Sequence, residues 1–161
     1  SNFIFTDKSL ENFFYLDIIS KIFPKAKVIN CRRDITSSIV STLKNNQVFL
    51  AWAHKLENIL KYYDIYHKMV ENFEKKNPKF IYHLQYEKFV NDPEIESKKL
   101  FKFCNLPWDI RCLEFYDREN LISRTASNIQ IKKPIYKDSE KKYAPYKNFL
   151  SKYANEYSWF D

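Results

Sequence analysis

Short apolar runs alternate along the chain with longer segments whose apolar residues recur every three or four positions. The short runs at 3–5, 28–31 and 80–85 predict buried strands, because they are too short for helices and end in turn-forming or charged residues. Helical spacing follows each of them. The segments that we expect to be helical are 10–22, the stretch from about residue 37, 50–75, 92–104, 108–116 and 139–153, the last interrupted at Pro145. Residues 121–136 lack a clear period and are expected to form a loop.

The apolar residues of two helical segments predict the faces that these helices bury. In the first segment they are Leu10, Phe13, Phe14, Ile18 and Ile22. In the long segment they are Leu56, Leu60, Tyr63, Val70 and Phe73. Pro24 ends the first helix, because proline lacks the N–H that would continue it. Asp92 is expected to cap a later helix, with Pro93 at its first position.

Strands that alternate with helices predict an α/β fold with three layers, in which helices cover both faces of a mostly parallel sheet. The 161 residues suffice for a single domain, 1–161, with a core of its own. Apolar residues make up 45% of the chain, which argues against disorder. No linker, repeat or low-complexity tract divides the sequence.

The net charge of +7 indicates an anionic partner. A nucleotide, another polyanion, a nucleic acid and an acidic membrane surface are all open at this level. The three cysteines, Cys31, Cys104 and Cys112, are few and odd in number, so we expect no disulfide framework and a reducing, cytoplasmic location. No spacing joins them to a histidine as a metal site requires, and no apolar run is long enough to span a bilayer.

The chain contains no glycine, although average usage predicts about eleven. A phosphate-binding loop of the Walker type and a dinucleotide fingerprint both need glycine for close backbone approach. Neither loop is therefore present in this sequence, and its turns must rely on Asn, Asp and Pro.

The segment 25–41 is typical of a phosphate site. Its strand runs through Arg33 into a helix, and open α/β sheets bind ligands where strand carboxyl ends meet helix amino ends. The N–H groups of the helix start attract anions, and Arg33 adds a planar fork suited to a phosphate. Ser41 lies about two turns into the helix, where its hydroxyl is expected to face the same anion. The alternative is that Arg33 forms half of an ordinary ion pair.

Four motifs occur in an order that resembles the sulfotransferases that use PAPS (3′-phosphoadenosine 5′-phosphosulfate), closest to tyrosylprotein sulfotransferase-like and bacterial members. They follow Asp7-Lys8 and a helix that ends at Phe23-Pro24. The motifs are Cys31-Arg32-Arg33-Asp34 with Ser41, Leu84-Gln85-Tyr86-Glu87, Asn105-Leu106-Pro107-Trp108, and the segment 125–136. The resemblance covers about residues 4–150 and implies the P-loop NTPase-like sulfotransferase fold.

The resemblance implies roles for particular residues. Arg33 and Ser41 match the groups that hold the 3′-phosphate of the nucleotide, and Tyr86 matches a tyrosine that contacts the nucleotide. The segment 127–136, including Gln130 and Lys133, matches a loop that wraps the nucleotide, and a basic residue after it corresponds to Lys142. Lys8 and Ser127 match the catalytic groups that stabilise the sulfuryl group in transfer. Such chemistry depends mostly on positioning and charge stabilisation.

Two departures limit what the resemblance implies. Family members carry a glycine-containing loop after their first strand, and soon afterwards the general base; both precede the region that this chain resembles. The sequence is therefore expected to be a truncated or degenerate form, similar to the carboxyl-terminal two-thirds of the family domain, whose sheet lacks its first strand. An exposed strand edge favours pairing with another chain, so a homodimer is expected. Asn45 also stands where relatives carry a nucleotide-binding arginine.

Three functions remain open. The first is transfer of a sulfuryl group from PAPS to a hydroxyl acceptor, which leaves PAP as the product. The second is a module that binds 3′-phosphoadenosine nucleotides without catalysis. The third is a basic nucleic-acid-binding protein, which is disfavoured because no helix carries the Arg and Asn pattern of base reading. A sugar, a phenol, a lipid alcohol and a protein tyrosine are all possible acceptors.

Bland interpretations of the same residues remain beside the functional ones. Lys8 is also typical of a solvated strand end, Ser127 of a turn, and Tyr86 of a core residue with a satisfied hydroxyl. The lysines near the carboxyl end can equally form a solvated basic face.

Overall fold

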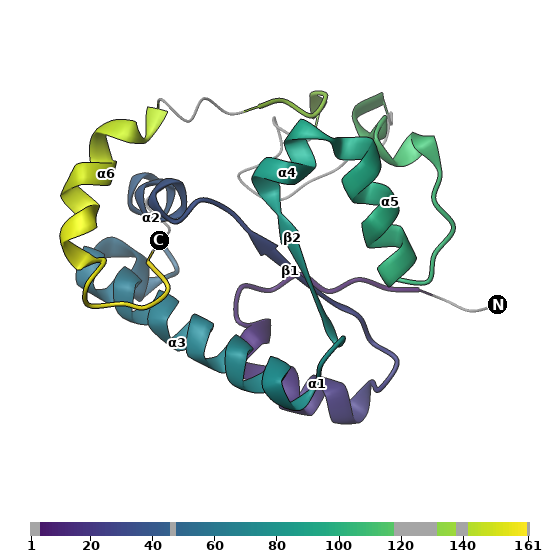
Figure 1. Ribbon diagram of the computed structural model, residues 1–161, viewed down its shortest axis with the longest axis horizontal. Coiled ribbons are helices and arrows are strands. Elements are labelled where there is room, and N and C mark those ends of the chain that lie inside the picture. Colours follow the sequence, from purple (N-terminus) through teal and green to yellow (C-terminus); the bar gives the residue numbers. More distant parts are fainter. Residues whose placement is uncertain (1–3, 46–47, 118–131, 138–141, 161) are drawn as a thin grey trace.

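The computed structural model describes residues 4–45, 48–117, 132–137 and 142–160. Two parallel strands, β1 (Val28–Arg32) and β2 (Ile81–Gln85), lie side by side over their whole length, with Val28 opposite Ile81 and Arg32 opposite Gln85 (Figure 1). These strands coincide with the predicted runs at 28–31 and 80–85. The parallel sheet that the alternation of elements predicted is therefore confirmed, in a small form.

Helices flank the sheet on both faces. On one face, Phe13, Leu16 of α1 (Leu16–Ile22), and Val70 and Phe73 of α3 (Leu56–Lys76) form a buried cluster with Ile81. On the other, the Tyr82 ring lies 5.2 Å from that of Phe103 in α5 (Pro93–Phe103). Figure 1 shows α1 and α3 on one side of the strands and α5 on the other. The α/β class and its helix–sheet–helix layering are confirmed.

A second core cluster fixes α2 (Ile35–Lys44) on α3. Ile39 and Val40 of α2 are buried against Ile59 and Leu60 of α3, and Tyr143, Leu150 and Phe160 from the carboxyl-terminal segment complete this cluster. The Asp34 side chain caps α2 by accepting the Ser37 N–H at 2.7 Å, so the helix begins two residues before its predicted start at Ser37. The core therefore places the amino end of α2 directly after β1.

Two predictions about the amino-terminal region are wrong. The described part of the predicted strand at 3–5 has no regular structure, and Ile4 and Phe5 are 68% and 76% exposed. An extended segment becomes a strand only where another edge accepts its backbone hydrogen bonds, and these residues pair with no strand in the described chain. The predicted helix at 10–22 consists of a 3₁₀ helix (Asn12–Tyr15) and α1, but Leu10, Phe14, Ile18 and Ile22 are exposed.

Several boundaries differ from the predicted ones. The segment 50–75 consists of a 3₁₀ helix (Ala51–His54) and then α3, whose predicted buried face is confirmed for Leu60, Val70 and Phe73. The helix α4 (Tyr86–Asn91) was not predicted, and 108–116 contains only 3₁₀ turns (Ile110–Cys112 and Phe115–Asp117). Pro145 does not interrupt a helix but lies in the first turn of α6 (Ala144–Leu150), where the backbone N–H has no partner within the helix. A 3₁₀ helix (Ser151–Tyr153) follows α6.

Three other expectations concern the cap of α5, membrane-spanning helices and the loop at 121–136. Asp92 occupies the cap position of α5, as predicted, but its side chain makes no capping hydrogen bond. None of the helices in the described ranges is long and apolar enough to cross a membrane. The predicted loop at 121–136 lies mostly outside the described residues.

The packing of α2 on α3 yields a testable stability difference within one helix. Ile39→Ala should lower the free energy of unfolding by about 2–5 kcal/mol, because Ile39 is fully buried and its loss leaves a cavity. Leu43→Ala is the matched control, and since Leu43 is 40% exposed the change should cost only about 0.5 kcal/mol. Urea unfolding measures both, and equal losses would contradict this packing.

Candidate nucleotide site

The carboxyl ends of the two strands are joined by one carboxylate. Glu87, just after β2, accepts the backbone N–H of Asp34 at 2.7 Å through one oxygen and the side-chain amide of Gln85 at 2.8 Å through the other. Asp34 in turn caps α2. The end of β1, the end of β2 and the start of α2 therefore meet at one crevice, the position at which open α/β sheets bind ligands.

Three residues with a predicted role in nucleotide binding gather at this crevice. The Arg33 guanidinium lies 5.0 Å from the centre of the Tyr86 ring and 5.5 Å from that of Tyr143. The Lys142 ammonium lies 5.2 Å from the same Tyr143 ring. Two cations and two aromatic rings thus converge from three parts of the chain. Such an arrangement suits a ligand that combines an anion with a planar ring.

Tyr143 is the central residue that sequence reasoning missed. It is only 6% exposed and belongs to the core cluster of α2 and α3, so its ring is a fixed surface between Arg33 and Lys142. The one signal in the sequence was its position directly after Lys142. Tyr143 lies 110 positions after Arg33, and spacing along the chain gave no indication that the two residues would be in contact. That contact depends on how α6 packs.

The other predicted cofactor residues are less closely placed. Ser41 is part-buried in α2 and its hydroxyl accepts a hydrogen bond from the Asn45 side chain at 3.1 Å, so its described partner is Asn45 and not Arg33. Lys133 is exposed, and no described contact brings it to the crevice. Ser127 and Gln130 lie outside the described residues.

A cavity of about 490 Å³ connects Lys8 to Arg33. Residues 8–10 form one side of it, and residues 28–33, which include all of β1, form another. Trp52 and Tyr62 also line it, and their ring centres lie 3.8 Å apart in a stack. The Trp52 Nε1 and the Tyr62 hydroxyl are buried, and neither has a hydrogen-bond partner among the described residues. The cavity runs along β1, which pairs within the described sheet with β2 alone. Lys8 is exposed and shares this space with Arg33.

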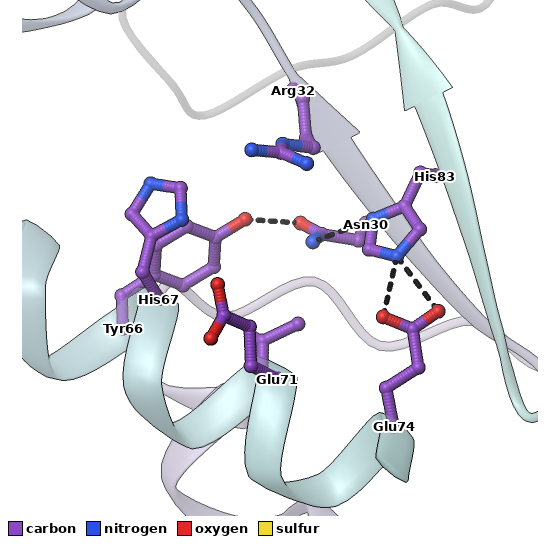
Figure 2. A pocket seen from close by; sticks show the side chains of 8 residues that line it. Asn30, Arg32, Tyr66, His67, Glu71, Glu74 and His83 are labelled. Atoms are coloured by element: carbon purple, nitrogen blue, oxygen red, sulfur yellow. Dashed lines mark hydrogen bonds and ion pairs between the residues drawn. The ribbon is translucent and has the colours of Figure 1, made fainter. Parts of the chain in front are cut away.

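A smaller recess of about 250 Å³ lies between β1, β2 and α3 (Figure 2). Across it, the Tyr66 hydroxyl donates to Asn30 Oδ1 at 2.7 Å, and Asn30 Nδ2 lies 3.2 Å from His83 Nδ1. His83 Nε2 lies 3.0 Å from both oxygens of Glu74. Because the amide nitrogen can only donate, His83 must accept at Nδ1 and carry its proton on Nε2. The four side chains therefore form one directed chain of hydrogen bonds.

His67 lines both spaces and has an unusual protonation equilibrium. Burial, followed by the positive charge of Arg32, lowers its pKa from 6.5 to about 4, against smaller opposing effects of Glu71 and Asp64. Its ring stacks on Trp159, with centres 5.2 Å apart. His67 is therefore neutral at physiological pH. In the described ranges, no group of three or more His, Cys, Asp or Glu side chains is arranged to hold a metal ion.

Known proteins match much of this chain. The family model described as "Sulfotransferase family" matches residues 2–110, which include Lys8, Arg33 and Tyr86. A protein of Aquifex aeolicus (strain VF5), described as an uncharacterized protein, is 33% identical over 149 residues. That match covers 90% of this chain and 19% of the relative, so the chain spans about a fifth of the relative's length.

The neutral state of His67 makes stability depend on pH in a defined window. Between pH 6.5 and about 4 the unfolded chain binds a proton at His67 that the folded chain does not, so the free energy of unfolding falls as the pH falls through this window. We expect His67→Phe, which keeps a ring against Trp159, to remove about 1–2 kcal/mol of that loss, after allowance for solvent screening. Urea unfolding at several pH values measures it, and parallel curves for the two proteins would contradict it.

Proposed function

The chain belongs to the sulfotransferase family, and we propose that it binds PAPS and contributes to the transfer of the sulfuryl group to an acceptor hydroxyl. The observation that carries the proposal is the convergence of Arg33, Tyr86 and Lys142 around Tyr143 at the carboxyl ends of the parallel strands. The residues fit such a nucleotide, because two cations face a position where the helix α2 also presents its amino end. When bound, PAPS supplies the sulfuryl group.

Each residue has a proposed task. Arg33 provides a planar fork of N–H donors for the 3′-phosphate, and Lys142 adds a second positive charge. Tyr86 contacts the nucleotide where β2 ends, and Ser41, Gln130 and Lys133 complete the cofactor site. Because Tyr86 and Tyr143 flank Arg33, their rings restrict the guanidinium before any ligand binds.

Lys8 and Ser127 are the proposed catalytic residues. Charge spreads over the sulfuryl oxygens during transfer, and an ammonium or a hydroxyl beside them stabilises it. Lys8 lines the cavity that also reaches Arg33, which supports a place beside the transferred group. Three free cysteines agree with the proposed cytoplasmic location, which cell fractionation checks.

One observation favours a binding module without catalysis as the second candidate. Transfer to a hydroxyl needs a general base, and no Asp or Glu of the described residues lines the cavity next to Lys8. His67 does line it, but with a pKa of about 4 it is a weak base. The nucleotide site and the chemistry are therefore separable.

The nucleotide site is tested by thermal unfolding with adenosine 3′,5′-bisphosphate, beside AMP and inorganic phosphate. At a hundredfold excess over its dissociation constant the bisphosphate should stabilise the fold by about 2.7 kcal/mol. Arg33→Ala should abolish this gain. Arg111→Ala is the matched control, because this guanidinium pairs with Asp109 and lines neither cavity, and it should keep the gain. Equal stabilisation by AMP, or a gain that survives Arg33→Ala, would refute the 3′-phosphate site.

The second edge of β1 supports a proposal about assembly. This edge pairs with no strand in the described chain, and the side chains of Phe14, Ile18 and Ile22 are 39%, 54% and 63% exposed. An unpaired edge and exposed apolar residues each favour association with another chain. We propose a homodimer in which two copies meet through the exposed apolar residues of α1 and the 3₁₀ helix before it.

Sedimentation velocity tests this assembly. The wild-type chain should sediment as a dimer, and Ile18→Lys, which places a charge on the exposed face of α1, should sediment as a monomer. A monomeric wild type at all concentrations would contradict the proposal.

Adding a separate peptide that carries a strand and a glycine-containing loop distinguishes the two candidate functions. A gain of turnover supports the transferase, and bisphosphate binding without turnover supports the binding module.

A further inference from the structure

The recess shown in Figure 2 contains two charged side chains that the nucleotide site does not use. Arg32 and Glu71 lie on opposite sides of the recess and point into the same space. Neither is held by a hydrogen bond or an ion pair within the described part of the chain, and the two are not paired with each other. The recess therefore offers an uncommitted guanidinium donor and an uncommitted carboxylate acceptor.

The pleat of β1 directs Arg32 toward the face of the sheet that α3 covers. Successive side chains of a strand point to opposite faces, so Arg32 follows Asn30 on the α3 face. Arg33, one residue later, lies against Tyr86 and Tyr143. Arg32 therefore lines the recess as well as the Lys8 cavity, whereas Arg33 lines the Lys8 cavity and not the recess.

The walls of the recess are fixed by their own contacts. The chain of hydrogen bonds from Tyr66 through Asn30 and His83 to Glu74 commits those four polar groups. His67 stacks on Trp159 and is neutral. Ligand recognition therefore depends on Arg32 and Glu71, which face each other across a rigid frame.

The opposite charges of the exposed Arg32 and Glu71 side chains disfavour two kinds of ligand. An anionic group that approaches Arg32 also meets the Glu71 carboxylate, and a cationic group that approaches Glu71 also meets the guanidinium. A hydroxyl avoids both conflicts, because it donates to a carboxylate and accepts from a guanidinium. A ligand with several hydroxyls on one ring can satisfy both side chains at once, whereas a phenol or an aliphatic alcohol has a single hydroxyl and would bury apolar carbon against charged groups.

Size and position agree with a sugar ring. The recess of about 250 Å³ is smaller than the roughly 300–1,000 Å³ of sites for drug-sized ligands, which suits one ring. It also adjoins the cavity that contains Lys8, because Asn30, Arg32, Tyr66, His67 and Val70 line both. A ring held in the recess therefore has one end directed toward the Lys8 cavity.

We propose that this recess is the acceptor subsite and that the acceptor is a neutral polyhydroxylated compound, a sugar, whose hydroxyls bind Arg32 and Glu71. This inference rests on the proposed function, and it selects one class from the sugar, phenol, lipid alcohol and protein tyrosine that the sequence leaves open.

The test is ligand-observed saturation-transfer NMR on the whole chain. The probes are the methyl glycosides of glucose, galactose and N-acetylglucosamine, with 4-methylphenol and 1-hexanol as the competing classes. At least one glycoside should bind, and its affinity should fall roughly tenfold in Arg32→Gln and in Glu71→Ala, since each change removes a hydrogen bond to a charged group. Glu57→Ala, in the first turn of α3 and outside the recess, is the matched control and should bind normally.

The result overturns the proposal if none of the three glycosides binds, if both recess variants keep full glycoside affinity, or if the phenol or the alcohol binds in a manner that depends on Arg32. Bisphosphate stabilisation is measured on the same samples. If both recess variants still bind the bisphosphate, they are folded. A loss of glycoside binding in these variants then comes from the recess and not from unfolding. Absence of bisphosphate binding in the wild type refutes the nucleotide site instead, so the two failures are distinguishable.

Discussion

The placement of the proposed nucleotide site depends on the carboxylate of Glu87. This group accepts the Asp34 N–H and the Gln85 amide, and so it fixes the ends of both strands against each other. Asp34 uses its own side chain to cap α2, which fixes the start of the helix to the same point. The backbone of Arg33 is therefore held between a strand end and a capped helix. A side chain that leaves a fixed backbone and lies between two aromatic rings loses little entropy when an anion binds.

The pleat of β1 then divides the chemistry between two faces. Val28 and Asn30 are directed toward α3, and Arg32 continues this alternation, while Arg33 follows the end of the strand toward Tyr86. A shift of the strand by one residue would exchange the two arginines and turn the apolar Val28 away from its core cluster. The burial of Val28 against α1 and α3 thus enforces the register on which both polar sites depend.

The sequence predicted best what local pattern determines. Short apolar runs located β1 and β2, and the family resemblance linked Arg33 and Tyr86 to one nucleotide. It failed where the outcome depends on a distant neighbour. Periodicity placed Leu10, Phe14, Ile18 and Ile22 on the buried face of one helix, but only Ile18 and Ile22 lie in α1, and all four are exposed. A period does not tell whether anything covers the face that it marks. Tyr143 was missed for the same reason, because its contact with Arg33 arises from the packing of α6.

The residues proposed for nucleotide binding and for catalysis, Arg33 and Lys8, are held in place to different degrees. Arg33 is fixed by the strand ends, the cap of α2 and a core tyrosine, whereas Lys8 belongs to an exposed segment without regular structure. Charge stabilisation of a transfer reaction requires a group to be held close to the productive geometry, since a small displacement costs much of the rate. Nucleotide binding through Arg33 tolerates an imprecise position of Lys8, whereas catalysis by Lys8 does not. On the proposed roles, the placement of residues 4–10 therefore affects transfer through Lys8 more than it affects binding through Arg33.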